Sequence, residues 1–89
     1  MNDTHETLNG WEHMHPHDLR GRRVMVRTEN GTVIDGALEV ADVTPRCQIT
    51  SLNVRDTNIY VVRCWRNGDD TWDNEPEAKL SVTIFKERP

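Results

Sequence analysis

Apolar and polar residues alternate along two neighbouring segments, residues 22–28 and 32–43. This period of two is typical of strands that bury one face and leave the other in water. The segments are separated by Asn30-Gly31. Asn-Gly between alternating segments predicts a β-hairpin with a type I′ turn, in which both residues take a positive φ. Gly36 lies in the middle of the second segment, where it predicts a bend or a close approach of another part of the chain.

Three further segments have strand character, residues 47–54, 58–66 and 79–86. The second of them contains the most apolar run, Ile-Tyr-Val-Val, and is expected to be a central strand. Five short strands with turn residues between them predict an all-β fold, a small, bent, five-stranded antiparallel barrel. We expect four side chains from three of these strands to meet in its core: Ile34, Leu38, Val61 and Val82.

The first 17 residues contain few apolar side chains. Leu8, Trp11 and Met14 recur every three residues, which predicts a short helix within residues 3–14 that ends before Pro16. The alternative is an irregular, untethered polar arm. The chain therefore divides into an N-terminal polar arm or short helix, residues 1–17, and a β-barrel, residues 18–89, that carries an acidic loop at residues 67–78.

The hairpin resembles the first sequence motif of the Sm-like proteins. The matching positions, in family order, are Leu19, Gly21, Val24, Val26, Asn30-Gly31, Gly36, Leu38 and Asp42. The resemblance implies a short N-terminal helix followed by a five-stranded SH3-like barrel, and homo-oligomers formed by strand-edge pairing. The residues after Asp42 are Val43-Thr44-Pro45-Arg46, without the Asn of the family's RNA-binding loop. The resemblance thus implies the architecture more than RNA binding.

Charge is unevenly distributed along the chain. The formal net charge is −4, and residues 67–78 contain five acidic residues and no basic ones. An acidic chain is a poor general binder of polyanions, although a local basic face can still bind nucleic acid. The candidates for such a face, with arginines for phosphates and aromatic rings for bases, are Arg23, Arg27, Arg63, Arg66, Tyr60 and Trp65.

The acidic loop contains a single tryptophan, Trp72. A tryptophan in a polar loop either folds back on the barrel or forms a contact for a partner. In the second case Trp72 would dock into a partner's pocket, and Asp69, Asp70 and Asp73 would face basic residues around it. The loop does not have the spacing of an EF-hand, so a solvated hairpin loop is favoured over a Ca²⁺ site.

Two other sets of residues have metal-binding or redox chemistry. His13, His15 and His17 alternate, and on an extended strand they would point to one side and could hold a metal ion. We expect a polar arm instead, without a metal. Cys47 and Cys64 lie on different expected strands and are interpreted as buried apolar residues, with a cross-strand disulfide as the alternative.

No catalytic motif accompanies these features. The expected function is therefore that of a non-enzymatic protein-interaction module, an accessory or regulatory protein of a bacterium or its phage. The alternative is an Sm-like barrel that binds RNA or single-stranded DNA. We expect a protein partner, no cofactor, no membrane association and a cytoplasmic location, because neither a signal peptide nor a long apolar run is evident.

Overall fold

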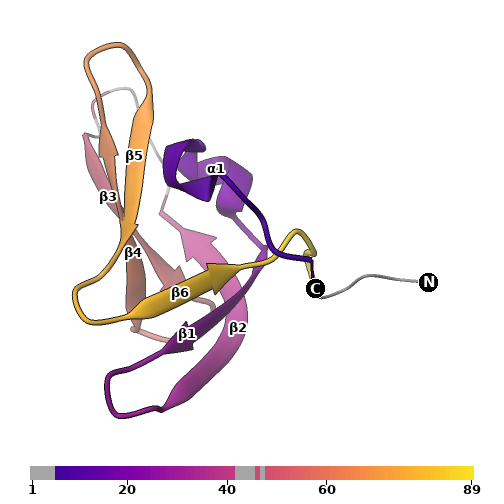
Figure 1. Cartoon of the computed structure of the whole chain (residues 1–89). Coiled ribbons are helices and arrows are strands. Elements are labelled where there is room, and N and C mark those ends of the chain that lie inside the picture. Colours follow the sequence, from indigo (N-terminus) through magenta and orange to yellow (C-terminus); the bar gives the residue numbers. More distant parts are fainter. Residues whose placement is uncertain (1–5, 42–45, 47) are drawn as a thin grey trace.

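The computed structural model describes residues 6–41, 46 and 48–89, which form one curled antiparallel sheet (Figure 1). Its strands follow the order β5-β4-β3-β2-β1-β6, and the sheet curls into a small, nearly closed barrel. The strands are β1 Arg23–Arg27, β2 Val33–Val40, β3 Ile49–Val54, β4 Tyr60–Arg66, β5 Trp72–Pro76 and β6 Ser81–Ile84. The predicted all-β barrel is confirmed, with six strands in place of five. In the described residues, no helix is long and apolar enough to span a membrane.

Strand β2 belongs to both halves of the barrel. Its residues 33–37 pair with β1, and its residues 38–40 pair with β3. Gly36 lies just before this change of partner, and a Cβ atom there would be 2.6 Å from Cγ1 of Val54. The close approach predicted for Gly36 is therefore confirmed, and it lets the sheet bend sharply.

The turn between β1 and β2 differs from the prediction. Gly31 has a φ of +86°, but Asn30 is not among the residues with positive φ, so the turn is not type I′. The amide of Thr28 donates to the carbonyl of Thr32 at 2.9 Å, and the amide of Gly31 donates to the carbonyl of Thr28 at 3.0 Å. This is a three-residue loop in which Gly31 forms a bulge after a turn. The Asn30 side chain accepts the Thr32 amide at 3.2 Å, a local bond that fixes the turn.

The acidic loop expected at residues 67–78 contains a strand, β5, so that expectation is wrong over residues 72–76. Trp72 and Asn74 point inward and are buried, whereas Asp73 and Glu75 point outward. Inward and outward positions alternate along this segment. The second inward position is a polar Asn, so the sequence does not alternate between apolar and polar residues and the strand is hard to recognise. The remaining turn, residues 67–71, has the same two backbone hydrogen bonds as the turn between β1 and β2. Asp70 takes the left-handed position in it, with a φ of 66°.

Two adjacent valines of β4 are both buried because the strand contains an irregularity. Leu52 of β3 pairs with Val62, but Asn53 pairs with Tyr60, so Val61 is the extra residue. Such a bulge lets consecutive side chains enter the same core. The cluster of buried residues includes Leu38 and Val61, with Ile34 and Val82 packed against it. The four side chains expected to meet in the core therefore do.

The N-terminal segment, residues 6–14, contacts both ends of the open sheet. On the β6 side, Thr7 forms a bridge with Phe85, and the Leu8 amide donates to the Ile84 carbonyl at 2.8 Å. On the β5 side, the carbonyls of Trp11 and Met14 accept hydrogen bonds from Asn74. We call residues 6–14 the latch, because they join β6 to β5.

The helical prediction for the arm needs correction. A 3₁₀ turn, η1 Trp11–His13, and a short helix, α1 Pro16–Leu19, replace one helix over residues 3–14. Gly10, with a φ of +80°, interrupts any longer helix. Pro16 begins α1 at a first-turn position, where its missing N–H costs nothing. The three apolar side chains of the predicted helix all contact the core: Trp11 is buried in it, and Leu8 and Met14 pack against it. Residues 1–5 lie outside the described part of the chain.

Candidate interaction surface

Trp72 begins β5 and is part of the core. It is only 3% exposed, and its ring meets the edge of the His15 ring at a centroid distance of 5.4 Å. Of the two outcomes weighed for this tryptophan, the structure therefore has the one in which it folds back on the barrel. Docking of Trp72 into a partner's pocket would require the removal of a core side chain.

The three aspartates named with Trp72 are exposed but are already engaged within the hairpin. Asp69 accepts the Thr71 hydroxyl at 2.6 Å and the Thr71 amide at 3.2 Å. These bonds, the hydroxyl first, lower the pKa of the Asp69 carboxyl. Asp70 forms an ion pair with Arg66 at 2.6 Å. The aspartates thus stabilise the turn between β4 and β5.

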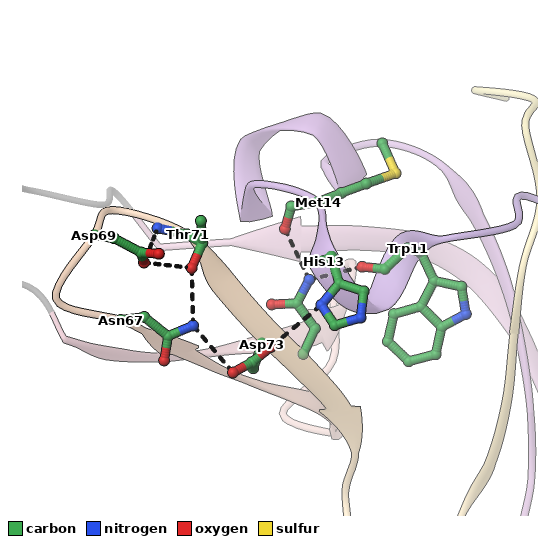
Figure 2. Close-up of polar contacts among 8 residues, drawn as sticks. Trp11, His13, Met14, Asn67, Asp69, Thr71 and Asp73 are labelled. Atoms are coloured by element: carbon green, nitrogen blue, oxygen red, sulfur yellow. Dashed lines mark hydrogen bonds and ion pairs between the residues drawn. The ribbon is translucent and has the colours of Figure 1, made fainter.

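Asp73 connects this hairpin to the latch (Figure 2). Asn67 donates to its carboxylate at 3.0 Å, and Nδ1 of His13 lies 3.2 Å from its other oxygen. His13 belongs to η1, His15 precedes α1, and His17 lies within it, so the three histidines do not lie on an extended strand, the arrangement that a shared metal ion would have used. The described residues contain no group of three or more His, Cys, Asp or Glu placed to hold a metal ion.

The candidate arginines for a basic face are divided between two parts of the sheet. Arg23 and Arg27 lie on β1, whereas Arg63 and Arg66 lie on β4, and β2 and β3 intervene. Arg23 forms ion pairs with Asp35 at 2.7 Å and Glu87 at 3.2 Å. The hydrogen bond with Asp35, followed by that with Glu87, raises the pKa of Arg23. Arg23 is therefore neutralised and unsuited to a phosphate.

The structure does bring Arg63 and Trp65 together on the outer face of β4. The guanidinium carbon of Arg63 lies 5.8 Å from the centroid of the Trp65 ring. Trp65 pairs across the ladder with Ile49 of β3, and paired side chains lie on the same face of a sheet. Ile49 is 59% exposed. We call Ile49, Arg63 and Trp65 the outer patch.

The outer patch has an acidic border on β5. Trp65 pairs with Asp73 and Arg63 pairs with Glu75, so both carboxylates lie on the patch side of the sheet. Arg63 also forms an ion pair with Glu77 at 3.2 Å. At the other end of the outer face of β4, Tyr60 is 56% exposed. An apolar and aromatic centre with a charged border is typical of a surface that binds proteins.

Sequence reasoning missed Ile49 as a functional candidate. Its position at the start of an alternating segment, with buried Thr50 next to it, is a signal that could have placed it outward. The assignment needed the register of β3, in which Ile49 pairs with Trp65. Residues 42–45 and 47, before this strand, are outside the described residues. Cys47 falls there too, so its expected burial and pairing are not described. Cys64 is free and buried.

Two open depressions lie elsewhere on the barrel. One has a volume of about 300 Å³ and is lined by Gln48, Arg66, Asn67, Gly68 and Asp70. The other has a volume of about 400 Å³ and lies beside the β1–β2 turn, where Thr28, Glu29 and Lys79 contribute to its wall. In the first, the charged groups are the Arg66–Asp70 ion pair, which already serves the turn.

Comparison of the chain with known protein families, with curated proteins and with solved structures finds no match in any of the three.

Proposed function

We propose that the chain is a non-enzymatic protein-interaction module that binds its partner through the outer patch. The observation that carries this proposal is the exposure of Ile49 directly opposite Trp65, whose ring lies under the Arg63 guanidinium. Tryptophan and arginine are enriched among the few residues that carry most of the binding energy of protein interfaces, and neighbouring contacts exclude water around them. A role in the cytoplasm, as an accessory protein of a bacterium or phage, fits such a module.

The border of the patch specifies the chemistry of the partner. Asp73 and Glu75 place negative charge on one side of an apolar centre. A partner that presents an apolar side chain with lysine or arginine beside it would complement both features. Charge of this kind affects the rate of association and the choice of partner more than the final affinity.

Affinity capture tests the proposal. The tagged chain is incubated with lysate of its own host after nuclease treatment, and bound proteins are identified by mass spectrometry. Ile49→Asp and Trp65→Ala should each lose the specific partner. Val33→Asp is the matched control, because Val33 is a strand residue that is 49% exposed but lies on β2. Retention of the partner by both patch variants, or its loss from the Val33 variant alone, would refute the proposal.

Nucleic-acid binding is the second candidate, and the Arg63–Trp65 stack favours it. A base can stack on a tryptophan, and an arginine can neutralise a phosphate. The ion pair between Arg63 and Glu77 weighs against it, because the carboxylate competes with phosphate. Binding of a labelled oligonucleotide distinguishes the two: phosphate contacts must weaken steeply as salt is added.

The finer likeness to Sm-like proteins is also a proposal. It rests on the hairpin of residues 19–42 and on a curled sheet with a short helical turn before it. Self-association through strand edges would follow from it. In β5, an outer strand of the sheet, Pro76 has no N–H to donate, which weakens pairing at that edge. Sedimentation at several concentrations would measure the assembly state directly.

A further inference from the structure

Arginine side chains gather around Gly21. Arg20 and Arg22 flank this glycine in the connection between α1 and β1, Arg55 follows β3, and Arg88 lies in the C-terminal segment. A Cβ atom at Gly21 would be 3.6 Å from Nη2 of Arg55 and 3.8 Å from Cδ of Arg88. Two residues from separate parts of the chain, Arg55 and Arg88, therefore lie against Gly21, and Arg22 follows it directly in the sequence. We call Arg22, Arg55 and Arg88 the arginine cluster.

Two of these arginines are bonded to neutral groups. Arg22 donates from Nε to the Asp18 carbonyl at 2.7 Å and from Nη1 to the Lys86 carbonyl at 2.9 Å. Arg88 donates from Nη2 to the same Asp18 carbonyl at 2.9 Å and from Nε to the Arg20 carbonyl at 3.1 Å. Backbone carbonyls orient a guanidinium without cancelling its charge, unlike the carboxylates bonded to Arg23.

Arg22 and Arg88 both donate to the Asp18 carbonyl, so their two positive charges lie side by side. Partial burial, and then the charge of Arg88, lower the pKa of Arg22, while the Asp18 carboxylate opposes this shift. The counter-charges within reach are Asp18 and Glu39, which pairs with Arg55 at 2.6 Å. Two carboxylates do not balance three guanidiniums, so an excess of positive charge remains on a chain whose net charge is −4.

We propose that the arginine cluster binds a single phosphate group, as the free ion or as a monoester. Arginine presents a planar fork of donors that matches phosphate oxygens, and its bonds to phosphate are charge-assisted. Arg22 and Arg88 each bind backbone carbonyls through two nitrogens, which leaves a third nitrogen on each guanidinium for a ligand. The inference is independent of the outer patch and of the function proposed for it.

The shape of the cluster favours a compact ligand over a nucleic-acid strand. A strand is bound along a track of cations with aromatic rings for its bases. The cluster converges on one glycine, and Phe85, an aromatic residue next to the C-terminal segment, is buried beneath Arg23 at 4.9 Å. A small dianion matches a convergent site better than a polymer does.

Titration of the ¹⁵N-labelled protein tests the proposal. Sodium phosphate is added at pH 7.5, where the dianion is the major form, and is compared with sodium chloride at equal ionic strength. The amide of Gly21 and the Nε–H groups of Arg22, Arg55 and Arg88 should shift with a saturable curve in phosphate but not in chloride. Identical responses to both salts would overturn the proposal.

Three variants make the test specific. Arg88→Gln should weaken phosphate binding by about tenfold, the effect of losing one charge-assisted contact. Arg27→Gln is its matched control, because Arg27 is also an exposed arginine but ends β1 and is not among the residues near Gly21. Glu39→Gln should tighten binding, since it frees Arg55 from a competing carboxylate. An unchanged affinity for Arg88→Gln, or weaker binding by Glu39→Gln, would refute the site.

Two further titrants identify the source of the phosphate. O-phosphoserine that saturates the same resonances more tightly than inorganic phosphate assigns the site to a monoester, and equal affinities assign it to the free ion. A ten-nucleotide single strand that saturates these resonances while inorganic phosphate does not would overturn the proposal in favour of nucleic acid.

Discussion

The side-chain amide of Asn74 donates a hydrogen bond to the main-chain carbonyl of Trp11 at 2.7 Å, between residues 63 positions apart. The same nitrogen donates to the Met14 carbonyl at 2.8 Å. Asn74 is 4% exposed, so these bonds form in a site from which water is excluded. One buried side chain of β5 therefore fastens one end of the latch.

Replacement of Asn74 by alanine should destabilise the fold by about 2–3 kcal/mol, because two carbonyls lose their partner in a buried site. Urea unfolding followed by tryptophan fluorescence measures the change. Glu75→Ala is the control, since Glu75 is the exposed neighbour on the same strand and should change stability by less than about 0.5 kcal/mol.

Asn74→Asp keeps the shape of the side chain but removes the donors at neutral pH. The variant should be at least as unstable as Asn74→Ala at pH 7 and should recover as the pH falls, because a protonated carboxyl can donate one bond to a carbonyl. In linkage terms, the folded variant binds a proton more tightly than the unfolded chain, so its stability rises toward low pH. A parallel pH profile for both variants would contradict this reason.

Gly36→Ala should cost about 1–3 kcal/mol. The added methyl group would lie 2.6 Å from Cγ1 of Val54, so β2 and the Val54 side chain of β3 must move apart. Gly68→Ala is the control, because nothing lies within 4 Å of a Cβ atom there. Thermal unfolding of the three proteins gives the comparison, and equal melting temperatures for the two variants would refute the steric explanation.

Lys79→Gly should stabilise the protein by about 0.5–1 kcal/mol, because Lys79 has a φ of 69° in the turn before β6. That gain corresponds to a rise of about 2–6 °C in melting temperature for a domain of this size. Ala78→Gly, one position earlier in the same turn, should instead lower it. A loss of stability in Lys79→Gly would show that its conformation is not strained.

The thiol of Cys64 should not react with iodoacetamide at pH 8 in the folded protein. Burial raises the pKa of this thiol to about 12, from an ordinary value of 9.0. The Cys47→Ser variant leaves one thiol, and mass spectrometry with and without urea follows its alkylation. Rapid modification in the folded state would contradict the burial of Cys64.

The raised pKa of Cys64 also determines how the stability of the fold changes with pH in the alkaline range. Between pH 9 and 12 the unfolded chain loses the Cys64 proton while the folded chain keeps it. The unfolded state then binds fewer protons, so this thiol makes stability fall as the pH rises above 9. Cys64→Ala in the Cys47→Ser background should have a flatter stability profile in that range.

The sequence predicts most of the fold because alternation is a local signal. Val24 and Val26 identify β1 directly, and they are fully buried. β5 is missed because Asn74 is polar, and its inward position makes sense only once Trp11 and Met14 lie beside it. The type of the first turn is mistaken because the Asn30 side chain, by bonding to Thr32, supports a different loop.

The candidate surface is less predictable, since it depends on pairing between distant strands. Nothing local in the sequence places Ile49 opposite Trp65, or separates Arg23 from Arg63 by two strands. Trp72 illustrates the same limit. Its polar neighbours suggest exposure, yet the strand that contains it turns the ring toward the core.

The latch joins residues near the start of the chain to strands near its end. During translation, Thr7 and Trp11 are synthesised before Phe85 and Asn74. The contacts of the latch can therefore form only after the later residues have been made. Contacts of such long sequence separation slow folding. A nascent chain stalled before residue 72 would therefore expose Trp11 and Leu8 to chaperones, and maturation of the protein should begin only after β5 and β6 have emerged.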